Sequence, residues 1–247
     1  MTTEKMNIRL FRNLELETSS MCNRACRTCM RNTHPDRAFV KSWFENNLMP
    51  MDMIKEVFKQ CNALGHNRRI CLNHYNEPFM DPRMVDIIHM AKEEGDHFVY
   101  LCSNGDFITK EIAREVDGVL NRIVLGLYVW EEPERTERKR WFRSLFQKTH
   151  LYVKGGHSAT HFGPGYLEEA EKYKDGPCNK FNRRMTISHR GRYLMCCEDI
   201  AGVFDMGTFP EVGLKDYWYG SKRREIFNDL CFAGGRHKHE YCITCPR

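Results

Sequence analysis

Three cysteines near the N-terminus have the spacing of a metal-binding loop. Cys22, Cys26 and Cys29 form a Cys-x3-Cys-x2-Cys pattern directly behind an alternating apolar run at residues 14–20. The alternation predicts a β-strand that ends in a loop carrying three thiolates. Three thiolates suit an iron–sulfur cluster, because cysteine thiolates hold its irons and three ligands leave one iron open. Zinc sites usually take four closed ligands, so a zinc loop or three unrelated buried thiols is the alternative.

The same cysteine motif resembles that of the radical S-adenosylmethionine (SAM) superfamily, where it lies in the loop after the first strand of a partial (β/α) barrel. The resemblance implies that Cys22, Cys26 and Cys29 hold a 4Fe-4S cluster whose open iron takes the amino and carboxylate groups of SAM. One-electron reduction would then cleave SAM to methionine and a 5′-deoxyadenosyl radical that abstracts hydrogen from a substrate. The residue before the third cysteine is usually aromatic in the family. It is Thr28 here, which weakens the adenine contact expected at that position.

Two further segments resemble SAM-binding motifs of the superfamily. Residues 75–78, Tyr-Asn-Glu-Pro, follow a predicted strand and are similar to Gly-Gly-Glu-Pro, which binds the SAM amino group. Residues 103–105, Ser-Asn-Gly, follow the next strand and are similar to Thr-Asn-Gly. Taken singly, each segment is also typical of an ordinary turn or helix cap, so their order behind the cysteine loop carries the resemblance. The side chains that it assigns to SAM binding are Asn76, Glu77, Ser103 and Asn104.

Four later cysteines follow a second spacing. Cys178-x12-Gly191-x4-Cys196 is followed by Cys242-x2-Cys245. This pattern resembles the start of the SPASM domain that accompanies many radical SAM barrels. Because two residues follow Cys245, we expect the shorter twitch version. The resemblance then implies one auxiliary 4Fe-4S cluster on these four cysteines, and a structural zinc knuckle on the same thiolates is the alternative.

The remaining cysteines have less specific patterns. They are Cys61, Cys71, Cys102, Cys197 and Cys231. Most lie in apolar stretches and are expected to be small buried hydrophobes, whereas the roles of Cys197 and Cys231, close to the auxiliary ligands, stay open. Glu198 directly follows Cys197 and is a candidate substrate contact. A cap on the neighbouring hairpin is the alternative role for this carboxylate.

The predicted secondary structure brings these motifs to one end of a sheet. Strands are expected at 14–20, 69–74, 97–102, 122–129 and 150–154, with helices at 51–63, 81–94, 109–120 and 135–147. This alternation is typical of right-handed βαβ units and a parallel sheet. Ligands bind at the carboxyl ends of the strands in such sheets, which is where the three motifs fall. The predicted fold class is α/β, with a partial (β/α) barrel of about five to six parallel strands.

The pattern changes in the last third of the chain. A β-hairpin is predicted at 184–196 and a helix at 221–230. We therefore expect a domain boundary near residue 170. The first domain, 1–170, would be the radical SAM partial barrel. The second, 171–247, would be a small twitch domain of hairpin plus helix that holds the auxiliary cluster.

The composition excludes several classes of protein. The 247 residues are 41% hydrophobic and 29% charged, which is ordinary for a soluble globular chain. No apolar run of about 18 residues and no export signal is visible. Twelve cysteines without an export signal favour a reduced cytoplasmic metalloprotein over a disulfide framework. The net charge of +5 permits an anionic partner, and we do not expect nucleic acid or a membrane.

Together these features predict a radical SAM oxidoreductase. The layout resembles twitch-containing radical SAM dehydrogenases that oxidise an alcohol of an aminocyclitol to a ketone, with the auxiliary cluster as electron acceptor. We expect a small polar substrate and a flavodoxin- or ferredoxin-type reductant. One alternative is a radical SAM enzyme that crosslinks or epimerises a ribosomal peptide. The non-enzymatic alternative is a zinc-stabilised nucleic-acid-binding protein.

Overall fold

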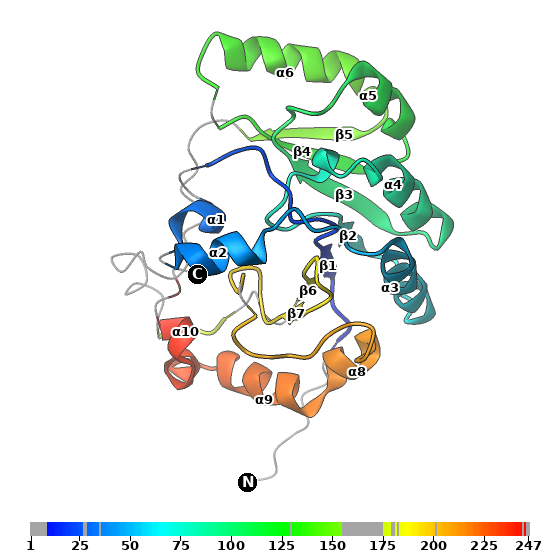
Figure 1. The fold of residues 1–247 in the computed structure, drawn as a ribbon. Coiled ribbons are helices and arrows are strands. Elements are labelled where there is room, and N and C mark those ends of the chain that lie inside the picture. The colour runs from blue at the N-terminus through cyan, green and yellow to red at the C-terminus, as the bar shows by residue number, and fades with distance from the viewer. Residues whose placement is uncertain are drawn as a thin grey trace.

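A seven-stranded sheet runs through the centre of the molecule in the computed structural model (Figure 1). Its strands are β1 (Asn13–Leu16), β2 (Arg69–Cys71), β3 (Phe98–Ser103), β4 (Arg122–Gly126), β5 (His150–Lys154), β6 (Arg184–Ile187) and β7 (Tyr193–Leu194). Their order across the sheet is β5-β4-β3-β2-β1-β6-β7, and β1 to β6 pair in parallel. The structure describes residues 9–26, 29–34, 36–128, 130–154, 175–178, 181, 183–200, 202–243 and 245. The predicted α/β fold with a parallel, barrel-like sheet is confirmed.

Helices cover one face of the sheet and continue beyond its edge (Figure 1). Those between successive strands are α3 (Met51–Ala63), α4 (Met84–Glu93), α5 (Lys110–Val116) and α6 (Glu134–Leu145). Near the C-terminus follow α8 (Leu214–Tyr219), α9 (Ser221–Leu230) and α10 (Glu240–Ile243). The short helices α1 (Met30–Thr33) and α2 (Arg37–Trp43) and the 3₁₀ turns η1 (Pro78–Met80) and η2 (Gly235–Lys238) complete the set of described helices. Within the described ranges, no helix is long and apolar enough to cross a membrane.

The strands divide their side chains between an apolar core and a polar interior face. Successive residues of a strand point to opposite faces of the sheet. In β1, Leu14 and Leu16 are fully buried in the main apolar cluster, while Glu15 takes the other face. In β3, Leu101 is fully buried, whereas Tyr100 is half-buried on the interior face. The interior face is therefore lined by groups that can hydrogen-bond a ligand.

The predicted C-terminal hairpin joins the barrel sheet directly. β6 pairs in parallel with β1, with Leu14 opposite Met185 and Glu15 opposite Thr186. β7 pairs antiparallel with β6, which confirms the hairpin. The predicted domain boundary near residue 170 lies outside the described residues. The division into 1–170 and 171–247 stays a prediction, and the described strands of both parts belong to one sheet.

Some helix boundaries differ from the prediction for local reasons. The helix expected from residue 81 begins at Met84, because the Asp81 carboxylate binds the backbone N–H and the guanidinium of Arg83. The helix expected to reach residue 120 ends at Val116, since Asp117 turns to accept backbone N–H groups at residues 147–149. Between the first cysteines and the helix at 51–63, where no helix was predicted, the chain forms α1 and α2, and Asp36 caps α2 through the Phe39 N–H.

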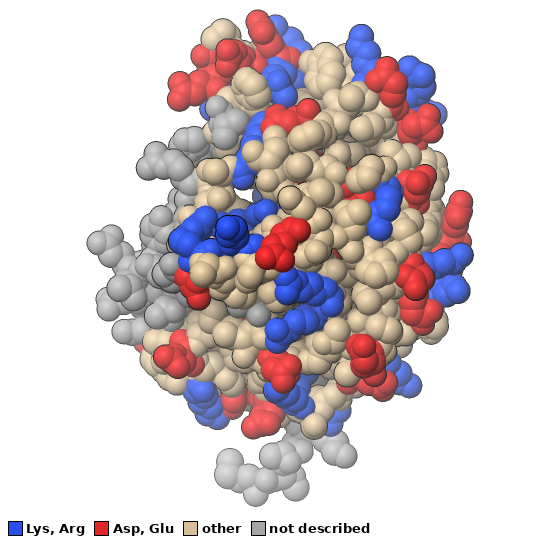
Figure 2. All heavy atoms as spheres, in the orientation of Figure 1, with Lys and Arg blue, Asp and Glu red and all other residues tan. Residues whose placement is uncertain are grey.

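Charges of both signs are spread over the face shown in Figure 2. Lysine and arginine side chains gather over the position of α1 and α2 in Figure 1, while acidic side chains lie between and beyond them. This mixture agrees with the small net charge of +5. On this face, the described residues form no large surface of a single sign.

A buried carboxylate at the end of β1 connects the barrel to the hairpin. Glu17 accepts the Tyr75 N–H at 3.1 Å and the His189 Nδ1–H at 2.7 Å. The side chains of Glu17 and His189 are almost fully buried. Burial alone would raise the pKa of Glu17, but the hydrogen bond and charge of His189, together with His74, outweigh it and hold that pKa below its usual range.

Replacing Glu17 is expected to loosen this connection. We predict that Glu17→Gln lowers the free energy of unfolding by about 2–3 kcal/mol at pH 7, because buried hydrogen bonds to a charged group are lost. A carboxyl with a depressed pKa stabilises the fold above its unfolded pKa of about 4.3, and this contribution disappears as the pH falls through the folded pKa. Urea unfolding should therefore show a smaller difference in the free energy of unfolding between the parent and Glu17→Gln at pH 4 than at pH 7.

The exposed carboxylate Glu211 offers the matched control for this measurement. Glu211→Gln makes the same chemical change and should leave the free energy of unfolding within about 0.5 kcal/mol of the parent. Equal stability of the Glu17 and Glu211 variants at pH 7 would contradict the role given to Glu17.

Candidate functional site

The first cysteine set lies in the loop beyond the carboxyl end of β1. Cys29 caps α1 and donates its backbone N–H to the Cys26 carbonyl at 3.1 Å, which closes the loop. Burial, with a smaller effect of the Cys22 and Cys26 thiols, raises the pKa of Cys29 to about 11. Burial and the Cys22 thiol likewise raise the pKa of Cys26. Because Cys22 affects both other thiols and Cys26 affects Cys29, the three predicted ligands lie near one another.

The second cysteine set gathers from three separate segments. Cys178 donates its backbone N–H to the Leu230 carbonyl at the end of α9, Cys196 follows β7, and Cys242 lies in α10. Burial, followed by the Cys245 and Cys178 thiols, raises the pKa of Cys242 to about 12. Cys196 has a raised pKa through burial and the thiols of Cys197 and Cys245, among other groups. The four predicted auxiliary ligands therefore lie together.

The donor chemistry of both sets fits iron–sulfur clusters. Among the described residues, no three Cys, His, Asp or Glu side chains converge closely enough to hold a single metal ion. A zinc ion would need such convergence, because it binds four ligands at about 2.0–2.3 Å. A 4Fe-4S cluster spreads its thiolates over different irons, so its ligands stand further apart. The two sets supply three and four thiols, which fits one cluster with an open iron and one fully ligated cluster.

The predicted SAM-binding residues meet beside the cysteine loop. Glu77 accepts the Ser103 hydroxyl at 2.7 Å with one carboxylate oxygen and the Asn104 N–H at 2.7 Å with the other. Burial raises the pKa of Glu77 to about 7, although these hydrogen bonds oppose the rise. Asn76 is turned differently, accepting the His74 N–H and donating to the Ser19 hydroxyl. The structure thus brings three of the four residues into direct contact and uses the fourth to shape the loop.

Side chains that the sequence analysis did not single out fasten the cysteine loop to the loop after β3. Asp106 accepts two hydrogen bonds from the Arg24 guanidinium, at 2.7 and 2.5 Å, and one from Asn23 at 2.8 Å. Arg138 of α6 approaches the same carboxylate at 3.5 Å. Asn104 adds a hydrogen bond to Asn23 at 2.8 Å. The two predicted binding loops are therefore held against each other.

Burial would raise the pKa of Asp106, but the hydrogen bonds from Arg24 and Asn23 and the charge of Arg138 outweigh it and hold that pKa below its usual range. The carboxylate is consequently ionised at neutral pH and keeps both guanidinium contacts.

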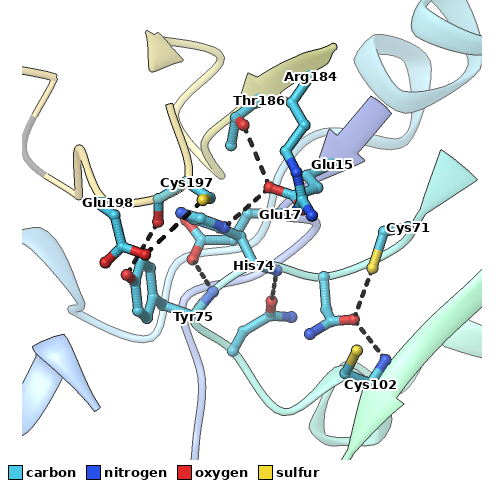
Figure 3. Close-up of polar contacts among 12 residues, drawn as sticks. Glu15, Glu17, Cys71, His74, Tyr75, Cys102, Arg184, Thr186, Cys197 and Glu198 are labelled. Carbon is cyan, nitrogen blue, oxygen red and sulfur yellow. Dashed lines mark hydrogen bonds and ion pairs between the residues drawn. The ribbon is translucent and has the colours of Figure 1, made fainter. Parts of the chain in front are cut away.

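The polar interior between the two cysteine sets contains groups suited to substrate binding (Figure 3). Glu15 pairs with Arg184 and accepts the Thr186 hydroxyl at 3.3 Å. His74 Nδ1 lies 3.6 Å from Glu15 Oε2, and the largely buried His74 Nε2 has no hydrogen-bond partner among the described residues. Sequence analysis missed this group, although Glu15 and Glu17 alternate with leucines at residues 14–17, a pattern that indicates a polar face.

The loop after β2 also touches the second cysteine set. The Tyr75 hydroxyl donates to the Cys197 carbonyl at 3.0 Å, and Figure 3 shows this tyrosine beside Glu198. Burial and the Glu198 charge raise the pKa of Tyr75 well above its usual value. The candidate substrate contact Glu198 is buried, and its carbonyl accepts the Tyr241 hydroxyl. These contacts place Glu198 at the boundary between the barrel interior and the second cysteine set.

Three further cysteines have distinct positions. Burial and then the Cys178 thiol raise the pKa of Cys231. The effect of Cys178 shows that Cys231 lies near the second set. Cys71, expected to be a buried hydrophobe, is buried but donates its thiol to the Asn73 side chain at 3.3 Å. Cys102 lies beside it, and both appear in Figure 3 on the interior face. The expected burial of Cys71 is therefore confirmed, and its strand also presents the thiol to a polar neighbour.

Comparison with known proteins gives consistent matches. Residues 16–175 match the Radical SAM superfamily. The S-adenosyl-L-methionine-dependent 2-deoxy-scyllo-inosamine dehydrogenase of Niallia circulans is 22% identical over 249 residues, covering 96% of this chain and 93% of the relative. The crystal structure of BtrN in complex with AdoMet and 2-DOIA has a TM-score of 0.79 at 21% identity, covering 97% of this chain and 94% of the other. Native anSMEcpe with bound AdoMet has a TM-score of 0.63 at 11% identity, covering 95% and 88%. The structural likenesses show a shared fold.

Proposed function

The chain belongs to the radical SAM superfamily, and we propose that it dehydrogenates a small polar substrate by a radical mechanism with an auxiliary iron–sulfur cluster. Family membership makes SAM and one 4Fe-4S cluster its cofactors, as the cysteine motif predicts. It also rules out the alternative of a zinc-stabilised nucleic-acid-binding protein. The similarity to a curated dehydrogenase over nearly the whole of both chains supports oxidation over other radical reactions.

We assign the cofactor contacts to the residues that the structure gathers. Cys22, Cys26 and Cys29 would hold the SAM cluster, and the Glu77 carboxylate would accept hydrogen bonds from the SAM ammonium. The Ser103 hydroxyl keeps Glu77 in place. When bound, SAM and its cluster supply the radical that removes a hydrogen atom, and an auxiliary cluster would accept the remaining electron.

Cys178, Cys196, Cys242 and Cys245 would hold the auxiliary cluster. A flavodoxin- or ferredoxin-type protein would supply the electron that starts the reaction.

The observation that carries the proposal is the hydrogen bond from the Tyr75 hydroxyl to the Cys197 carbonyl. Tyr75 lies two residues before Glu77, and Cys197 directly follows an auxiliary ligand. The bond therefore joins the SAM loop to the auxiliary cysteine loop. A substrate bound on the interior face beside it would be close to both proposed cofactor sites, as a transfer of hydrogen and then of an electron requires.

The interior side chains can bind and deprotonate an alcohol. Oxidation of a secondary alcohol to a ketone removes a hydrogen atom from carbon, a proton from oxygen and one electron. We assign the proton to His74 Nε2, which is buried, has no hydrogen-bond partner among the described residues and is oriented by Glu15. Glu15, Thr186 and Glu198 could accept or donate hydrogen bonds to the other hydroxyl or amino groups of the substrate.

Substitution of Glu77 tests the proposed SAM contact. Because the pKa of Glu77 is raised to about 7, its ionised fraction falls as the pH drops from 8 to 6. SAM affinity of the parent protein, measured by calorimetry under anaerobic conditions, should weaken over this range. Glu77→Gln should bind SAM about tenfold or more weakly at pH 8, because a charge-assisted hydrogen bond is lost, and its affinity should vary less with pH.

The exposed Glu115 provides the matched control, and Glu115→Gln should keep the affinity and the pH dependence of the parent. An unchanged affinity and pH slope in Glu77→Gln would remove Glu77 from the SAM site.

Isotope transfer tests the dehydrogenation itself. Cyclitols and aminocyclitols deuterated at the carbinol carbons are incubated with reduced holoenzyme and SAM. We expect deuterium in 5′-deoxyadenosine and one matching ketone. In a Cys242→Ala/Cys245→Ala variant, deuterium transfer should persist while the ketone falls by about tenfold or more, because the electron acceptor is missing. A variant that makes as much ketone as the parent would contradict the role of the auxiliary cysteines.

A further inference from the structure

A pocket opens at the amino ends of the central strands, the end opposite the candidate site. It has a volume of about 630 Å³, within the range of pockets that bind small molecules. Its lining residues are Arg12, Asn13, Arg68, Arg69, Phe98, Arg183 and Arg184. Five of these seven are arginines, and we call this site the arginine pocket.

The parallel register of the sheet builds the arginine pocket. Asn13 lies opposite both Arg69 and Arg184, and Arg69 lies opposite Phe98, so four strands begin in one row. The residue directly before each of Asn13, Arg69 and Arg184 is also an arginine. These three, Arg12, Arg68 and Arg183, share backbone hydrogen bonds with the neighbouring strands. Residues far apart in sequence therefore meet at one mouth of the sheet.

A further guanidinium borders this mouth. Arg122, the first residue of β4, lies over the Phe98 ring at 5.5 Å, and Arg69 lies over the same ring at 5.8 Å. The buried Nε of Arg122 has no hydrogen-bond partner among the described residues. A buried donor without a partner costs free energy, and an acceptor from a ligand would satisfy it.

The charge of the arginine pocket is largely uncompensated. Arg184 pairs with Glu15 from the interior face. In the described part of the chain, no carboxylate lies within 4.0 Å of the other arginines at this mouth. They are Arg12, Arg68, Arg69, Arg122 and Arg183. Like charges gathered in this way repel one another and raise the free energy of the fold, so the arrangement is typical of a site for an anion.

We propose that the arginine pocket binds a small molecule that carries two or more phosphate groups. The planar guanidinium presents paired N–H donors that match phosphate oxygens. One phosphate group carries about two negative charges, whereas a diphosphate or triphosphate comes closer to balancing five guanidinium groups. The concave shape favours a small ligand over the flat surface of a protein partner.

This proposal goes beyond the dehydrogenation and does not depend on it. Along β1, Glu17 is four residues beyond Asn13, which corresponds to about 13 Å at 3.3 Å per residue. The phosphates would therefore bind at the opposite end of the sheet from Glu77 and the cysteine loop. The Arg184–Glu15 pair lies between the two sites.

Calorimetry with inorganic pyrophosphate tests the arginine pocket on the holoprotein. We expect saturable binding that weakens as the salt concentration rises and that is tighter than binding of orthophosphate. Arg69→Gln/Arg183→Gln removes two exposed guanidinium groups that make no side-chain hydrogen bond among the described residues. This variant should bind pyrophosphate about tenfold or more weakly, because charge-assisted contacts are lost.

The matched control is Arg140→Gln/Arg143→Gln on the exposed side of α6, which makes the same change in net charge. It should retain the affinity of the parent. Far-UV circular dichroism and iron content check the folding of each variant, and the single substitution Arg68→Gln provides the same test if the double variant unfolds.

Three results would overturn the proposal. They are absence of pyrophosphate binding to the parent, an equal loss of affinity in the α6 control, and equal affinity for orthophosphate and pyrophosphate. Capture of an acidic protein by the parent without pyrophosphate binding would also overturn it and would assign this mouth to a protein partner.

Discussion

A single buried carboxylate, Glu17, holds the two halves of the candidate site together. It stands at the end of β1, between the loop that leaves β2 and the hairpin of β6 and β7. Both loops supply groups to the site: Tyr75 and Glu77 from one side, and the turn at His189 that leads towards the auxiliary cysteines from the other. Without an acceptor at this position, two buried N–H groups would lose their partner, and the two loops would no longer be bound to the same side chain.

The parallel sheet distributes opposite chemistry to its two ends. Loops at the carboxyl ends carry thiols, which can ligate iron, and carboxylates, which can accept hydrogen bonds from an ammonium group. The amino ends carry arginines without nearby described carboxylates, apart from the Arg184–Glu15 pair. That pair lies between the two ends and gives the interior its mixed polarity, with Glu15 also turned towards His74 and Thr186 (Figure 3). One sheet thus serves a proposed redox site and a proposed phosphate site without mixing their charges.

The sequence alone predicts features that local patterns encode. The cysteine spacings identify both thiol sets, and periodicity predicts α3, α9 and β5 with the observed boundaries. It does not predict contacts that depend on strand register, such as the Tyr75–Cys197 bond or the Arg24–Asp106 pair. Arg69 and Arg184 look like ordinary charged residues at strand ends, and only the pairing of both strands with β1 makes them neighbours. The α1 helix was missed because it is a single short turn of mostly polar residues, and no element was predicted over the seven residues of α2 although Val40 and Trp43 lie on one buried face.

The most direct test of the central claim, two thiol sets that each hold a 4Fe-4S cluster, is an anaerobic count of metal and sulfide per chain. It compares reconstituted parent protein with a Cys22→Ala/Cys26→Ala/Cys29→Ala variant and a Cys242→Ala/Cys245→Ala variant. Two clusters predict about eight irons in the parent and about four in each variant. About four irons with one zinc in the parent, with the zinc lost in the Cys242/Cys245 variant, would contradict the auxiliary cluster and leave dehydrogenation without its electron acceptor.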